Sequence, residues 1–223
     1  MRDILEVAAL CFGFLGWATI GISLQDKYWR ESTTEGSVIT TSTIYGNLWM
    51  SCASDSLGVY NCHDFQSMLA LPGYIQACRA FMISAIVLGT FGIISTLFGM
   101  QCSNAGGDNY ILKGRIVTLG GLCFLLQGLC TMVAVSWYAF TITQEFFDPL
   151  YPGIKYEIGK GLYIGWSSAV LALCSGSLLL CTCNLETAEN KIALPPQPHT
   201  RSHKTSRSLS ESTCSQYEKN VYV

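Results

Sequence analysis

Cysteines are the residues of this sequence with the widest choice of chemistry, because a thiol can cross-link, bind a metal, attack a substrate or carry a lipid. The chain has 11 of them among 223 residues. Cys52 and Cys62 flank a short stretch whose Ser-Leu-Gly centre can turn, so a disulfide between them could join two antiparallel strands. A bond closing so short a loop contributes about 2–3 kcal/mol. Disulfides persist only on the oxidising side of a membrane, so the membrane topology decides which of these cysteines can form one.

Catalytic and metal-binding sets are missing from the sequence. It contains no Ser-His-Asp or Cys-His set, no metal-ligand spacing and no glycine-rich phosphate loop. His63 and Asp64 are one histidine and one carboxylate, which is too few for a metal site. We therefore expect no enzyme activity, no cofactor and no metal. The formal net charge of −2 gives no reason to expect nucleic-acid binding.

The composition indicates a membrane protein. Hydrophobic residues make up 50% of the chain and charged residues only 13%, and the mean hydropathy is +0.34. A membrane-spanning helix needs about 20 apolar residues. We predict four spans, at 7–24, 79–100, 116–137 and 161–183. The first could instead be a signal peptide, but it lacks a basic leader beyond Arg2 and a clear cleavage site.

Basic residues predict the orientation of the spans. Lys113 and Arg115 lie in the loop 101–115, and further Lys and Arg residues lie in the tail 184–223. Basic residues favour the cytoplasmic side, so this loop, the tail and residues 1–6 are expected there. Residues 25–78 and 138–160 are then extracellular. The tail is polar and predicted to be disordered.

This topology sorts the cysteines. On the extracellular side lie Cys52, Cys62 and Cys78, and Cys78 begins the second span, where an unpaired thiol behaves as a small hydrophobe. Three cysteines at the predicted cytoplasmic membrane boundary are candidates for S-palmitoylation, namely Cys102, Cys181 and Cys183. The alternative is that they are ordinary cysteines at helix ends.

The first extracellular segment is rich in strand-forming residues. Residues 37–43, 45–52 and 58–65 predict strands of a small antiparallel sheet. So small a sheet needs the disulfide and the helix ends for stability. The second segment displays Phe146 and Phe147, which we interpret as protein contacts, whereas Trp137 and Tyr138 fit an interfacial aromatic belt.

These residues together resemble the claudin signature. The pattern is Trp29, the pair Leu48-Trp49, the two cysteines, Arg79 near the second span, and Phe-Phe-Asp-Pro in the second segment. The resemblance covers residues 1–185. One departure is Asn47, where the family usually has glycine before Leu-Trp.

The resemblance implies a membrane α+β fold, with a left-handed four-helix transmembrane bundle and a five-stranded antiparallel extracellular β-sheet. Leu48 and Trp49 would pack at the foot of the sheet, and the disulfide would clamp strands three and four. Claudins polymerise with themselves and other claudins at epithelial tight junctions. The expected contacts between neighbours involve Met68, Phe146, Phe147 and Ile158.

The same resemblance implies a pore. Acidic residues around the paired cysteines line the claudin channel, and here Asp55 and Asp64 match the cation-pore subgroup. Carboxylates in a narrow aqueous passage attract monovalent cations and repel anions. The alternatives are solvated aspartates in a barrier claudin that does not conduct, or an auxiliary subunit of another channel.

The C-terminus offers a further contact. The chain ends in Tyr222-Val223, and an apolar side chain beside a free carboxylate can dock in a PDZ groove by strand addition. The claudin resemblance implies junction scaffold proteins as the partners of this ligand.

Overall fold

The computed structural model describes residues 2–33, 42–55, 58–65, 71–100 and 110–193. Some residues to which the sequence assigns a role lie outside these ranges, namely Met68, Cys102, Tyr222 and Val223.

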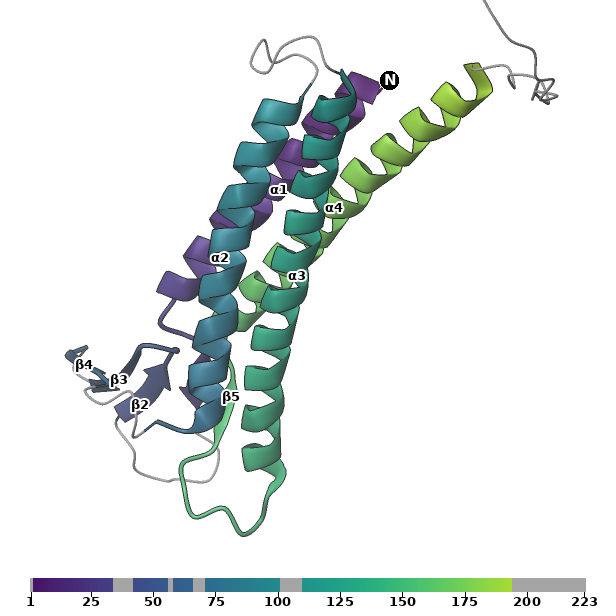
Figure 1. Ribbon diagram of the computed structural model, residues 1–223. Coiled ribbons are helices and arrows are strands. Elements are labelled where there is room, and N and C mark those ends of the chain that lie inside the picture. The colour runs from purple at the N-terminus through teal and green to yellow at the C-terminus, as the bar shows by residue number, and fades with distance from the viewer. Residues whose placement is uncertain (1, 34–41, 56–57, 66–70, 101–109, 194–223) are drawn as a thin grey trace, which may run out of the picture.

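Four long helices form a bundle, with a small sheet at one end (Figure 1). Each helix contains a membrane-length stretch whose mean hydropathy is between 1.7 and 2.1. The helix ends at residue 2, residue 99 and residue 110 lie at the end of the bundle away from the sheet (Figure 1). The helices are α1 (Arg2–Gln25), α2 (Gly73–Gly99), α3 (Tyr110–Phe147) and α4 (Lys160–Ala193).

The spans are apolar outside and partly polar inside. Phe91 and Leu129 are 58% and 53% exposed, whereas Thr96, Gln127 and Ser168 are fully buried between helices. In water this distribution would be unfavourable, but in lipid the apolar side chains face acyl chains and the polar ones find partners inside the bundle. The four helices therefore match a transmembrane bundle in burial as well as length.

Serine hydroxyls join α1 to α4 along one seam. Ser168 donates to the carbonyl of Gly16 at 2.6 Å and Ser175 to that of Ala9 at 2.6 Å, while Ser23 donates to the carbonyl of Gly161 at 2.8 Å. The positions on each helix recur every seven residues, which is the spacing of a left-handed crossing between helices. Small residues and hydroxyl bonds are the usual means of helix association in lipid.

Five strands form one antiparallel sheet in the order β4-β3-β2-β1-β5. Because β1 follows α1 and β5 precedes α4, pairing of Arg30 with Ile158 brings the ends of these two helices together. The amide of Gly159 also donates to the carbonyl of Trp29 at 3.0 Å. The strands are β1 (Arg30–Ser32), β2 (Ser42–Gly46), β3 (Met50–Asp55), β4 (Tyr60–Asp64) and β5 (Tyr156–Ile158).

The structure confirms the predicted fold class, but several strands and helices begin or end at other residues than predicted. The predicted strand 45–52 is two strands, because the chain turns at residues 47–49 between β2 and β3. Helix α2 begins at residue 73 rather than 79, α3 continues to residue 147, and α4 continues to residue 193. The sequence boundaries followed hydropathy, but a helix can continue past the membrane through polar residues that favour it.

Candidate functional site

Trp29 anchors the sheet to the bundle. Its side chain is fully buried, and its indole nitrogen donates to the carbonyl of Ser23 at 2.6 Å. Its ring meets that of Tyr138 on α3 edge to face, with centroids 5.3 Å apart. Aromatic pairs of this kind contribute about 0.5–1.5 kcal/mol beyond the area that they bury. The residue therefore connects the end of α1, the start of β1 and the C-terminal part of α3. Tyr138 is 1% exposed, so its assignment to an interfacial aromatic belt was wrong.

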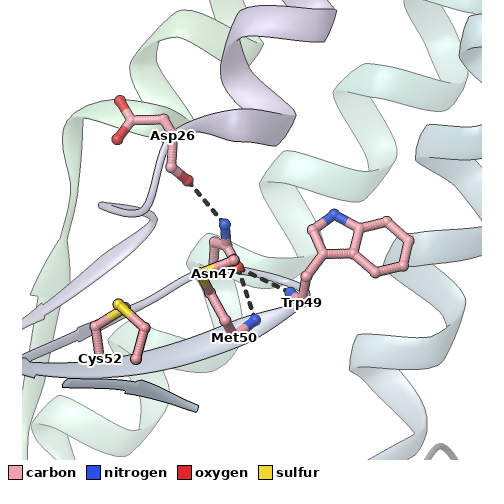
Figure 2. Close-up of a disulfide and its surroundings, with 6 residues drawn as sticks. Asp26, Asn47, Trp49, Met50 and Cys52 are labelled. Carbon is pink, nitrogen blue, oxygen red and sulfur yellow. Dashed lines mark hydrogen bonds between the residues drawn. A yellow bond between two sulfur atoms is a disulfide. The ribbon is translucent and has the colours of Figure 1, made fainter. Parts of the chain in front are cut away.

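Asn47 builds the turn between β2 and β3. Its side-chain oxygen accepts hydrogen bonds from the amides of Trp49 at 2.8 Å and Met50 at 2.9 Å, and its side-chain nitrogen donates to the carbonyl of Asp26 at 3.1 Å (Figure 2). Asparagine favours such turns because its side chain imitates a backbone amide. The departure from the claudin pattern at this position thus supplies a tie from the turn to the end of α1.

Arg79 holds the next two residues of the turn. Its Nε donates to the carbonyl of Leu48 at 2.7 Å, and its guanidinium lies 4.9 Å from the ring of Trp49. Leu48 is fully buried and Arg79 is 8% exposed. A charged hydrogen bond combined with stacking suits arginine and not lysine, because the guanidinium is planar. These signature residues, which the sequence singled out, meet at the foot of the sheet.

The disulfide lies where the sequence places it. Cys52 on β3 and Cys62 on β4 are directly opposite each other in the ladder and form the bond (Figure 2). Cys52 is 1% exposed, and β4 is an edge strand of the sheet. The disulfide therefore fixes the edge strand in register.

The two candidate pore carboxylates point to opposite faces of the sheet. Side chains alternate along a strand, so residues at even separation share a face. Asp64 shares the face of Cys62, whereas Asp55 is three residues from Cys52 and lies on the other. We call them the disulfide face (Tyr45, Cys52, Tyr60, Cys62 and Asp64) and the Asp55 face (Ala53, Asp55, Asn61 and His63).

The disulfide face is partly covered and carries charges of both signs. Tyr28 stacks on Tyr45 with ring centroids 4.6 Å apart, and Lys160 lies 4.6 Å from the ring of Tyr28. Lys27 lies 5.4 Å from the ring of Tyr60. Burial, with the neighbouring phenol of Tyr28, raises the pKa of Tyr45. A carboxylate on this face therefore shares it with ammonium groups that the sequence reasoning missed.

The Asp55 face is open at the edge of the sheet. All four residues that define it are exposed. By strand pairing Arg30 belongs to the same face, but two strands away, where its guanidinium lies 4.6 Å from the ring of Tyr156. Burial lowers the pKa of Arg30, but nearby phenols, Tyr138 foremost, outweigh it and raise the pKa overall. Its charge is therefore retained beside the bundle, away from Asp55.

A second candidate site is a groove where α3 meets β5. It has a volume of about 330 Å³ and contains three of the predicted contact residues, Phe146, Phe147 and Ile158. Phe147 is 75% exposed, and Lys155 lies 5.6 Å from the ring of Phe146. The groove is lined mainly by apolar and aromatic side chains, together with Thr143 and Glu157. Met68, its expected occupant, lies outside the described residues.

The remaining candidate residues lie at the other end of the helices. Cys181 is exposed on α4, at a position where a lipid chain could be attached. Cys183 follows on the same helix. Cys78 lies instead near the start of α2, at the sheet end of the bundle, where it is buried with its thiol 3.3 Å from the carbonyl of Ala134.

Comparisons with known proteins agree with this architecture. Residues 3–179 match the PMP-22/EMP/MP20/Claudin family, and the chain belongs to that family. It is 44% identical to claudin-15 of Rattus norvegicus over 227 aligned residues, which cover 98% of this chain and 100% of the relative. Claudin-15 of Bos taurus is 51% identical over 181 residues, covering 79% of this chain and 77% of the relative. Claudin-19 of Homo sapiens is 44% identical over 185 residues, covering 82% and 83%. Its claudin relatives are structural junction proteins, and together with the four apolar helices they make the chain a multi-pass membrane protein of the tight junction.

Proposed function

We propose that this claudin forms a paracellular channel that selects small monovalent cations, with Asp55 as the main selectivity residue. The observation that supports it is the exposure of Asp55 on a face whose outer edge carries no lysine or arginine among the described residues. A carboxylate about 8 Å from a permeating ion, at a dielectric between water and protein, contributes about 0.5–2 kcal/mol. That energy gives a several-fold preference for cations, and subunits repeated around a pore increase it.

Asp64 has the smaller role in this proposal. It lies on the disulfide face, where Lys27 and Lys160 bring positive charge and Glu31 and Glu157 pair directly across β1 and β5. Mixed charges on one face weaken any net preference. Residues 55 and 64 of one subunit cannot both line a passage bounded by a single face of its sheet.

Assembly uses the groove between α3 and β5. In this proposal Met68 of one subunit inserts beside Phe146, Phe147 and Ile158 of its neighbour. Methionine suits such a site because its flexible, polarisable side chain packs well against aromatic rings. Linear polymers of subunits assembled in this way, from this chain or other claudins, place the extracellular β-sheets of many subunits side by side.

The proposal extends to the cytoplasmic side of the membrane. Both termini and the loop 101–115 lie in the cytoplasm, so the sheet is extracellular. Tyr222-Val223 binds PDZ junction scaffold proteins, and S-palmitoylation of Cys102, Cys181 or Cys183 holds the helix ends at the lipid surface.

A barrier without conductance is the second candidate function. The observation that favours it is the mixed charge of the disulfide face, which gives no selectivity if that face bounds the passage.

The test is a dilution potential across a tight epithelial monolayer with and without the protein. We expect expression to lower resistance and to produce sodium preference, and Asp55→Asn to reduce that preference several-fold. Asp148→Asn, at an exposed position after α3, is the control. If resistance rises without charge preference, the protein is a barrier and the pore proposal is wrong.

A further inference from the structure

Three polar atoms in the membrane interior lack a hydrogen-bond partner among the described residues. They are the indole nitrogen of Trp17 on α1 and both amide atoms of Gln127 on α3, and each is buried. Gln127 is fully buried as a whole residue. Polar groups buried in a protein are almost always hydrogen-bonded, and in lipid no solvent is present to replace a missing partner. The two side chains therefore need each other or a shared bridging group.

The two side chains meet at one point, which is Gly89 on α2. A Cβ built at Gly89 would lie 2.6 Å from Oε1 of Gln127 and 2.6 Å from Cδ1 of Trp17, the ring carbon bonded to the indole nitrogen. Two atoms that are each so near one point lie close to each other. Because each atom lies 2.6 Å from that point, Cδ1 of Trp17 and Oε1 of Gln127 are at most about 5 Å apart, a separation that a direct hydrogen bond after side-chain rotation or one bridging water molecule can span.

The approach of these two side chains crosses the bundle rather than following one of its seams. The extensive helix contacts are α2 with α3, α1 with α4, and α3 with α4, so α1 and α3 face each other diagonally. Trp17 and Gln127 reach across this diagonal only because residue 89 of α2 has no side chain to separate them.

We propose that Trp17 and Gln127 form a hydrogen-bonded clasp inside the membrane, in which the indole N–H donates to the Gln127 amide oxygen directly or through one buried water molecule. The clasp joins the helix that leads into β1 to the helix that contacts β5. It thus fixes the spacing of the two helices that adjoin β1 and β5, at the end of the sheet opposite the disulfide. Gly89 is the positioning residue that leaves room for it.

The test reads the indole protons directly. The full chain is labelled with 15N-tryptophan in detergent micelles, and the Trp17 signal is assigned by its loss in Trp17→Phe. We expect Gln127→Leu to shift the Trp17 indole proton upfield, as for a lost hydrogen bond. The matched controls are Trp29, which donates to Ser23 at 2.6 Å, and Trp166, which donates to Ser136 at 3.2 Å, and their signals should stay in place. An unchanged Trp17 signal in Gln127→Leu would overturn the proposal.

A second readout covers the case in which Gln127→Leu does not fold. The side-chain amide signals of Gln127 are then followed in wild type and in Trp17→Phe, where the clasp predicts a shift and independent side chains predict none. In wild type, magnetisation exchange between the Trp17 indole proton and a bound water identifies the bridged form, and its absence with a shifted signal identifies the direct bond. Melting temperatures give the same answer, because the double variant should lose no more than the more damaging single variant.

Discussion

The two ends of the sheet differ in what their residues do. At the foot, which comprises Trp29, Asn47, Leu48, Trp49 and Arg79, the residues are buried or half-buried and are joined to the helices by hydrogen bonds and ring contacts. At the outer edge, residues 58–64 are all exposed and Asp55 lies beside them. The difference separates stability from selectivity. Substitutions at the foot should change folding, whereas replacement of an exposed carboxylate at the edge should change mainly the charge that an ion meets.

The largest effect is expected at the foot, for Trp29→Ala. Removal of a fully buried tryptophan that also donates a hydrogen bond should cost about 3–5 kcal/mol of unfolding free energy. The measurement is the melting temperature in detergent together with delivery to the cell surface. Trp137→Ala is the control, because Trp137 is 44% exposed on α3. Equal effects of the two substitutions would contradict the anchoring role of Trp29.

The disulfide lies between the two regions and should have an intermediate effect. Replacing Cys52 and Cys62 together by serine should cost about 2–3 kcal/mol, because the unfolded chain regains the freedom of a short loop. Denaturation of the wild type with and without reductant checks this value. Cys174→Ser, at an exposed position of α4, should not change the melting temperature.

Asn47→Ala tests the turn that the family builds with glycine. Loss of its hydrogen bonds to Trp49, Met50 and Asp26 should cost about 1–2 kcal/mol. Asn61→Ala is the matched control at the outer edge, where the side chain is exposed. If the Asn61→Ala variant has the lower melting temperature of the two, the distinction between foot and edge fails.

The smallest effect on stability is expected for Asp55→Asn. An exposed, isosteric substitution should change the unfolding free energy by no more than about 0.5 kcal/mol. Chemical denaturation of the purified variant measures this change. A large loss of stability would mean that Asp55 has a structural role, and its effect on ion preference could not then be assigned to the pore.

The sequence predicted the transmembrane helices and the disulfide of the molecule well. Uncharged stretches predicted four spans, and the Cys52–Cys62 spacing predicted a bond between strands, because both depend on local composition. Boundaries were less predictable. The turn at Asn47 was hidden inside an alternating pattern, and α3 continues past its apolar part to residue 147.

Charge on the two faces could not be predicted either. The positions of Lys27 and Lys160 over Tyr60 and Tyr28 depend on how α1 and α4 enter the sheet, which no local pattern records. The opposite directions of Asp55 and Asp64 follow from strand register alone. Counting from each cysteine along its strand would have shown this, once the register of the pair was known.

Reversal of one charge distinguishes Asp55 from Asp64 as the residue that selects the ion. Dilution potentials should be compared for Asp55→Lys and Asp64→Lys at matched junctional abundance, with the wild type in parallel. We expect Asp55→Lys to convert sodium preference into chloride preference and Asp64→Lys to leave sodium preferred. If Asp64→Lys reverses the preference and Asp55→Lys does not, the passage is bounded by the disulfide face and the assignment to Asp55 is wrong.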